Sequence, residues 1–237
     1  MTLRANARVA GLTLLIYIVT GIGSHALFSL TSAGEGTAAR LASIAQHVTL
    51  VRASALLLLL EFLCELILAV TLFALTRDQD RDLAFLAMGC RLTEGVIAAM
   101  ATGSRLDLLA AAIASRTATG ADAAAAQALG ALLLNGTAGP AALCFSVGNL
   151  IVASLFLRAR SIPVWLASLG VVASILGLAE FSLEMLGFLH GPATVVPWIP
   201  MALFELILAL WLLIKGVAVR SSREAPAPYA TPSGSIA

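Results

Sequence analysis

Apolar residues in this chain are gathered into long runs that only short polar segments interrupt. One bilayer crossing takes about 20 apolar residues as a helix, at a rise of 1.5 Å per residue. Six runs approach or exceed that length, and they cover residues 9–30, 52–75, 83–102, 139–157, 163–189 and 197–214. The pattern therefore predicts an all-α, polytopic transmembrane helical bundle with six spans, in a single domain over residues 1–219.

The segments between the runs differ in character. Residues 31–51 carry glycines and charges and predict a loop with some helix, whereas the charge run TRDQDRD at 76–82 is typical of a solvated turn. Residues 103–136 mix Ala-rich stretches with charges, which favours an interfacial helix. Residues 220–237 are rich in Ser, Pro, Ala and Gly, so we expect a disordered cytoplasmic tail.

Composition excludes two classes of protein. The chain is 60% hydrophobic and only 11% charged, with a mean hydropathy of +0.99, which excludes an ordinary water-soluble domain. Its formal net charge is +1, and Lys and Arg do not cluster with aromatic residues, so a nucleic-acid partner is not expected. The lipid bilayer is the expected partner.

Basic residues are divided unevenly between the two sides of the predicted bundle. With six spans, one side collects nine of the fourteen Lys and Arg residues: Arg4, Arg8, Arg77, Arg81, Arg158, Arg160, Lys215, Arg220 and Arg223. The other side keeps Arg40, Arg52, Arg105 and Arg116. Because cytoplasmic loops carry the excess of Lys and Arg, both termini are predicted to be cytoplasmic.

The first run also has features of a cleaved secretory signal peptide. Arg4 and Arg8 precede it, and the small residues Ser24 and Ala26 flank His25 near its end. The run nevertheless continues to Leu30, which is long enough to span, and the distribution of basic residues fits best when it is kept. We therefore expect a retained first span.

Seven ionisable residues fall inside the predicted spans. They are Glu61, Glu65, Arg91, Glu94, Glu180, Glu184 and Glu205. Charged groups at this depth normally face the interior of a bundle, and spacings of three or four residues place each pair on one helix face. If they form one buried polar cluster, six carboxylates would face one guanidinium. Protons, a bound cation or a water-filled cavity must then offset the excess negative charge.

Three functions remain open from these charges. The Glu and Arg side chains can specify helix packing or partner binding, or they can form a proton- or cation-linked transport pathway. The third interpretation is an intramembrane enzyme acting on a lipid-like ligand, for which His25, His47 and His190 are weak zinc candidates together with Glu180 or Glu184. The sequence lacks HExxH, GxSxG and a Gly-rich phosphate loop, so neither catalytic residues nor a cofactor are predicted.

Four segments carry a resemblance to a known family. They are ARVAGLTLLIYIVTGI, LAMGCRLTEGVIAA, LFLRARSIPVWLASLG and FELILALWLLIKGV, between Ala7 and Val217. Together they resemble the bacterial membrane family catalogued as domain of unknown function 4386. The resemblance implies a compact helical bundle in a bacterial cytoplasmic membrane, and Arg91, Glu94, Glu205 and Lys215 as its polar positions. It implies no activity, substrate or catalytic residue.

Overall fold

The computed structural model describes residues 2–134, 139–189, 194 and 196–218. Within these residues the regular structure is helical, with eight α-helices and no strand. The helices are α1 (Leu3–Thr31), α2 (Gly36–Gln46), α3 (Val48–Thr76), α4 (Arg81–Ser115), α5 (Ala121–Leu134), α6 (Gly139–Ala159), α7 (Val164–Met185) and α8 (Trp198–Ile214). The prediction of an all-α bundle is confirmed.

Local sequence explains where several helices begin and end. The Thr2 hydroxyl accepts a hydrogen bond from the Ala5 amide at the start of α1, and the Asp80 carboxylate does the same for Leu83 at the start of α4. Pro163 and Pro197 directly precede α7 and α8, where a missing backbone N–H costs little. Gly216 ends α8 in the left-handed conformation, at φ 74°.

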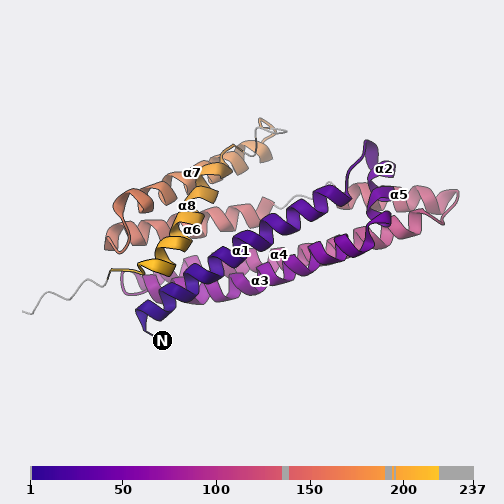
Figure 1. The fold of residues 1–237 in the computed structure, drawn as a ribbon. Coiled ribbons are helices and arrows are strands. Elements are labelled where there is room, and N and C mark those ends of the chain that lie inside the picture. Colours follow the sequence, from indigo (N-terminus) through magenta and orange to yellow (C-terminus); the bar gives the residue numbers. More distant parts are fainter. Residues whose placement is uncertain (1, 135–138, 190–193, 195, 219–237) are drawn as a thin grey trace, which may run out of the picture.

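The helices form two groups that pack against each other (Figure 1). Helices α1, α3 and α4 lie side by side along much of their length, and α6, α7 and α8 form the second group. Helix α6 packs on α4 and α8 packs on α1, which joins the groups. The short helices α2 and α5 pack on α4 at the far end of the first group.

Five helices, α1, α3, α4, α6 and α7, are long and apolar enough to cross a membrane. Helix α8 is also apolar but has 17 residues, which corresponds to about 26 Å. Large apolar side chains such as Val19, Met100 and Leu132 are exposed on the outside of the bundle, as expected where lipid replaces water. The chain is therefore a multi-pass membrane protein.

Helix α4 differs most from the sequence prediction. The expected third span, residues 83–102, lies within it. Helix α4 is 35 residues long in all and continues to Ser115 without a break at Gly103. The Ala- and Leu-rich sequence beyond Gly103 favours helix strongly enough to offset one glycine. The interfacial helix expected over 103–136 is thus corrected: residues 103–115 extend α4, and only residues 121–134 form a separate helix.

Other boundaries differ by smaller amounts. Helix α3 begins at Val48 rather than near residue 52, and α7 ends at Met185 rather than near 189. The loop with some helix expected at 31–51 is observed, with α2 as its helix, and Leu41 and Ile44 of α2 join Leu108 and Leu109 of α4 in a small apolar core. The predicted tail at 220–237 lies outside the described residues, and the sides of the membrane assigned to the termini remain a prediction.

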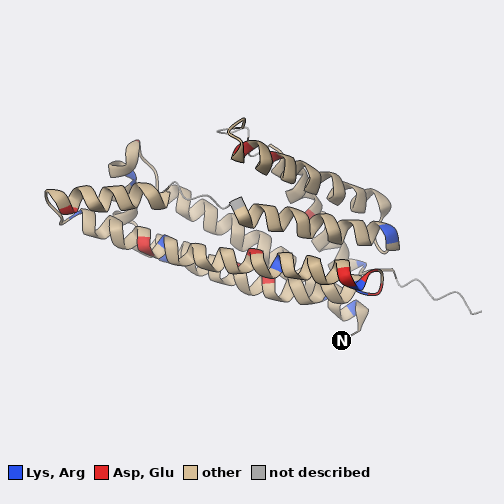
Figure 2. Ribbon diagram, turned by 180° about the vertical axis from the view of Figure 1, so that it is seen from behind, with Lys and Arg blue, Asp and Glu red and all other residues tan. Residues whose placement is uncertain are grey.

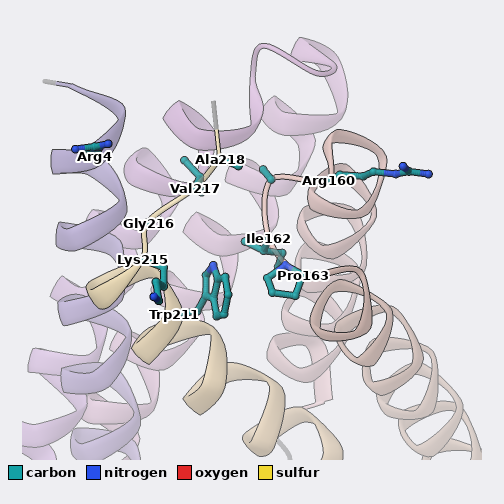
Figure 3. Close-up of a pocket in the computed structure, with 10 residues that line it drawn as sticks. Arg4, Arg160, Ile162, Pro163, Trp211, Lys215, Gly216, Val217 and Ala218 are labelled. Carbon is teal, nitrogen blue, oxygen red and sulfur yellow. The ribbon is translucent and has the colours of Figure 1, made fainter. Parts of the chain in front are cut away.

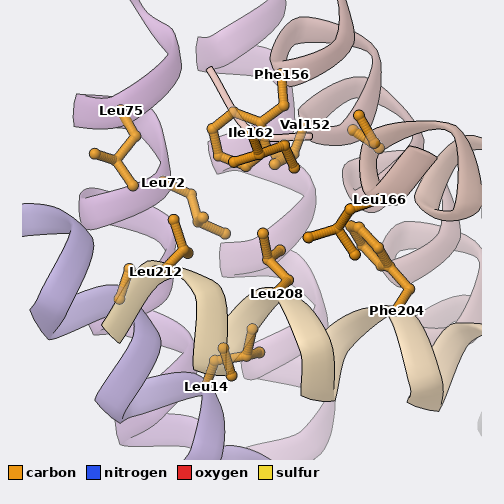
Figure 4. Packing of buried hydrophobic residues seen from close by; sticks show 14 of the residues in the cluster. Leu14, Leu72, Leu75, Val152, Phe156, Ile162, Leu166, Phe204, Leu208 and Leu212 are labelled. Carbon is orange, nitrogen blue, oxygen red and sulfur yellow. The ribbon is translucent and has the colours of Figure 1, made fainter. Parts of the chain in front are cut away.

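The main apolar core lies between the two groups of helices (Figure 4). Leu14 of α1, Leu72 of α3 and Leu208 and Leu212 of α8 meet there. At the crossing of α1 and α8 the backbones almost touch, because a Cβ added at Gly11 would lie 2.6 Å from the Ala209 carbonyl oxygen. Glycine is therefore required for this close approach.

Candidate functional site

Arg91 lies at the centre of a polar network between the two groups of helices. Its guanidinium is 2% exposed, and it binds three carboxylates, each at 3.1 Å. Nη1 donates to Glu65 of α3 and to Glu94 one turn along α4, and Nη2 donates to Glu205 of α8. The i, i+3 spacing of Arg91 and Glu94 explains why both side chains reach the same place.

Two neutral polar residues complete the network. Asn149 of α6 accepts a hydrogen bond of 2.8 Å from Arg91 Nη2 and donates one of 3.2 Å to Glu205 Oε1. Tyr17 of α1 donates from its hydroxyl to Glu94 Oε1 at 3.1 Å. We call these six residues, Tyr17, Glu65, Arg91, Glu94, Asn149 and Glu205, the Arg91 network. It joins α1, α3, α4, α6 and α8.

Aromatic rings and glycines fix the position of the guanidinium. The Arg91 Cζ lies 5.0 Å from the centre of the Phe145 ring and 5.9 Å from that of Tyr17, within the range of cation–π attraction. A Cβ at Gly95 would come within 2.9 Å of the Glu65 Cβ, so this glycine lets α3 and α4 approach beside the network. The geometry is thus set by packing on several sides.

The network lies near the middle of the expected membrane thickness. Arg91 is ten residues from the start of α4, Asn149 is ten from the end of α6 and Glu205 is nine from the end of α8. Nine or ten residues of helix rise by about 14–15 Å, which is half of a hydrocarbon core of about 30 Å. The helix ends from which they are counted lie at one end of the bundle (Figure 1).

The network is deeply buried and its charges do not balance. Glu65, Glu94 and Glu205 are 1%, 7% and 5% exposed, so bulk water does not screen them. With all groups ionised, three carboxylates and one guanidinium would carry a net charge of −2. Isolated charge is very costly in a low-dielectric interior, and about two protons shared among the three carboxyl groups would neutralise the network.

The same helices carry the match to a known family. A family model described as "Domain of unknown function (DUF4386)" matches residues 9–216. The chain belongs to the DUF4386 family. No curated protein and no solved structure matches the chain. The matched range includes every residue of the Arg91 network.

Glu61 lies outside the Arg91 network of this DUF4386 protein, one helical turn from Glu65 on α3. It is half-buried, and its carboxylate faces α1, where a Cβ at Gly21 would lie 3.2 Å from Glu61 Oε1. Arg105 of α4 is close enough to interact electrostatically with it. Arg105 in turn donates to the buried Ser24 hydroxyl at 2.7 Å and stacks over the Phe28 ring at 4.3 Å. These groups form a second polar site, farther along the bundle.

The two acids on α7 do not join the Arg91 network. Glu180 is buried, and its carboxylate accepts a hydrogen bond of 3.1 Å from the Trp198 indole of α8. Glu184 is exposed, because it lies in the last turn of α7, near Met185 and Leu186 on the outside of the bundle. The seven ionisable residues expected in one cluster therefore divide into the Arg91 network, the Glu61–Arg105 site, Glu180 and an exposed Glu184.

The histidines of the DUF4386 chain offer little for a zinc site. His25 and His47 are both exposed, and His47 Nδ1 lies 2.8 Å from the Ser43 carbonyl oxygen of its own helical turn. His190 lies outside the described residues. Among the residues that the structure describes, no three His, Cys, Asp or Glu side chains are placed to hold a metal ion.

Charged residues elsewhere gather at the ends of the bundle (Figure 2).

Asn149 and Tyr17 were not among the predicted site residues, because neutral polar side chains in apolar runs are not distinguished by charge. Asn149 still gives a partial signal in the sequence, because it is the one amide side chain inside the run at 139–157. The Arg91 network is the candidate functional site.

Proposed function

We propose that this protein is a small proton-linked carrier of the bacterial cytoplasmic membrane, in which the Arg91 network binds the coupling proton. The observation that supports this most directly is the set of three carboxylates at 3.1 Å from one buried guanidinium. Such a set holds more acid than its cation can neutralise. Carriers use acidic residues near the membrane midplane for ion coupling.

A proton on this network would change how the helices are held together. Protonation of Glu205 would weaken its ion pair with Arg91, and that contact joins α8 to α4. The hydrogen bonds of Asn149 would change as well, because it binds both Arg91 and Glu205. Gain and loss of a proton would then shift the packing between the two groups of helices, which is what alternating access requires.

The second polar site supplies a route away from the network. Glu61 lies on α3 one turn closer than Glu65 to the far end of the bundle, where α2 and α5 pack. The Arg105–Ser24 pair lies beyond Glu61 in the same direction. A proton leaving Glu65 would meet Glu61 next. Protons suit this site better than a metal ion, because they need no shell of ligands and no metal-binding group is found among the described residues.

The proposal is tested by proton flux into liposomes that contain the purified protein and a pH-sensitive dye. Under an imposed potential, the wild-type protein should acidify the lumen faster than protein-free liposomes. Glu65→Gln and Glu205→Gln should reduce the rate to the protein-free level, because an amide cannot bind and release the proton. Glu184→Gln is the matched control and should retain the wild-type rate, since Glu184 is exposed and outside the network.

A purely structural role for the network is the second candidate. One specific observation favours it: the Arg91 network joins five helices through one side chain. In that case, folded Glu65→Gln and Glu205→Gln proteins would show the same proton flux as the wild type. Equal flux in variants that still fold but unfold at a lower temperature than the wild type would therefore refute the carrier proposal and favour the structural role.

A further inference from the structure

A pocket opens at the end of the bundle where α1 begins and α8 ends (Figure 3). Its volume is about 590 Å³, and three segments line it: Arg4 of α1, residues 160–163 between α6 and α7, and Trp211 with residues 215–218 at the end of α8. A backbone hydrogen bond of 2.9 Å from the Ala218 amide to the Ser161 carbonyl joins two of them. The pocket is thus built by packed, connected segments.

The lining is basic. Arg4, Arg160 and Lys215 line the pocket, and none of the described lining residues is acidic. A smaller pocket of about 240 Å³ adjoins it, shares Arg4 and Lys215, and adds Arg8. In Figure 3 the Arg160 side chain extends away from Trp211, whereas Lys215 lies beside it. Arg4 and Lys215 line both pockets. The charge suits an anion.

One further observation indicates a ligand. The Ser161 side chain is buried, at 9% exposure, and its Oγ has no hydrogen-bond partner although the residue lines the pocket. Arg160 ends α6 in the left-handed conformation at φ 50°, where glycine is the least strained residue. This conformation closes α6, where the Ser161 amide donates to the Phe156 carbonyl oxygen. The unpaired buried hydroxyl is the feature that is typical of a binding site.

The apolar part of the lining extends the pocket toward lipid. Ile162, Pro163 and Trp211 form part of its wall, and Ile214 beside it is 70% exposed on the outside of the bundle. A tryptophan and basic side chains at a helix end are characteristic of the membrane interface, where basic pockets between helices hold lipid head groups.

We propose that this pocket binds a phosphate group, with Arg4 and Lys215 pairing with its charge and Ser161 donating a hydrogen bond, and that an anionic phospholipid supplies it. The lipid's acyl chains would leave the pocket past Ile214. This site is separate from the Arg91 network and does not depend on the carrier proposal. It would place an anionic lipid between α1, α8 and the turn that joins α6 to α7.

The test is native mass spectrometry of the full-length protein in neutral detergent, titrated with phosphatidylglycerol or phosphatidylcholine. The wild type should retain phosphatidylglycerol in preference to phosphatidylcholine. The double variant Arg4→Gln, Lys215→Gln should bind phosphatidylglycerol about twenty-fivefold more weakly, at about fivefold for each basic residue lost. Ser161→Ala should weaken binding about fivefold through loss of one hydrogen bond.

The matched control is the double variant Arg77→Gln, Arg81→Gln, which removes two charges near the same end of the bundle without touching the pocket lining. It should bind phosphatidylglycerol as the wild type does. Equal losses in the two double variants, or none in either, would overturn the proposal. A parallel titration with inorganic phosphate separates the sources: protection from thermal unfolding by phosphate alone, lost on Arg4→Gln, Lys215→Gln, would assign the site to a soluble phosphate.

Discussion

Arg91 makes its contacts through two nitrogen atoms, and each atom serves two acceptors. Nη1 is shared by Glu65 and Glu94, and Nη2 by Asn149 and Glu205. The Arg91 Nε is buried and has no hydrogen-bond partner among the described residues. A lysine has no planar fork of donors and could not reproduce this arrangement.

Removal of Arg91 should destabilise the protein severely. Arg91→Leu leaves Glu65, Glu94 and Glu205 without their shared cation, which costs about 3–5 kcal/mol for a buried ionic group. The thermal unfolding midpoint in detergent should fall by on the order of 10 °C. Arg91→Leu combined with Glu65→Leu and Glu205→Leu should recover part of that loss, because fewer acids remain unpaired. A single variant as stable as the wild type would show that the ion pairs contribute nothing.

The sequence predicts part of this site for clear physical reasons. Ionisable residues in apolar runs stand out, and i, i+3 spacing places Arg91 and Glu94 on one helix face, so these residues and Glu65 and Glu205 were found. Spacing along α7 could not show that Glu184 faces outward, since that depends on which side of the helix is packed. Tyr17 and Asn149 carry no charge, and their role appears only when five helices meet.

At the scale of elements, glycines determine how closely neighbouring helices approach. Gly11 brings α1 against α8, and Gly170 brings α7 against Phe204 of α8 and Ala153 of α6. A Cβ at Gly170 would lie 2.5 Å from the Phe204 ring. Gly170, Ser174 and Gly177 are spaced four and three residues apart on one face of α7, and all three are buried.

Gly11→Leu should separate α1 from α8. A side chain at this position would collide with the Ala209 carbonyl and the Leu213 amide, which are backbone atoms and cannot move aside alone. We expect a loss of at least about 1–3 kcal/mol, measured as a lower unfolding midpoint in detergent. Gly103→Leu is the control, because a Cβ at Gly103 meets nothing within 4 Å. Equal midpoints for the two variants would contradict the close crossing of α1 and α8.

The sequence predicted which segments form helices better than it predicted where those helices begin and end. The apolar runs located α1, α3, α4, α6, α7 and α8, because each must bury backbone polar groups inside a membrane. The extension of α4 to Ser115 was missed, since charges at Arg105 and Asp107 indicate the end of a span but not the end of a helix. At 35 residues, or about 52 Å, α4 is longer than the hydrocarbon core.

At the scale of the whole molecule, polar groups are arranged from one end of the bundle toward the other. The basic pocket with Arg4 and Lys215 lies at the end where the chain starts. The Arg91 network follows about 15 Å along the helices, and the Glu61–Arg105 site lies beyond it. Apolar side chains of the main core pack around the Arg91 network, whose charged groups are buried away from lipid.

The central claim is that the Arg91 network holds protons because its carboxylates outnumber its cation. Infrared difference spectroscopy of the glutamic acid C=O stretch, in protein reconstituted at neutral pH, tests it most directly. We predict a protonated carboxyl signal in the wild type and in Glu184→Gln, and a smaller signal in Glu65→Gln, Glu94→Gln and Glu205→Gln. A wild-type spectrum with all carboxyl groups ionised would contradict the account.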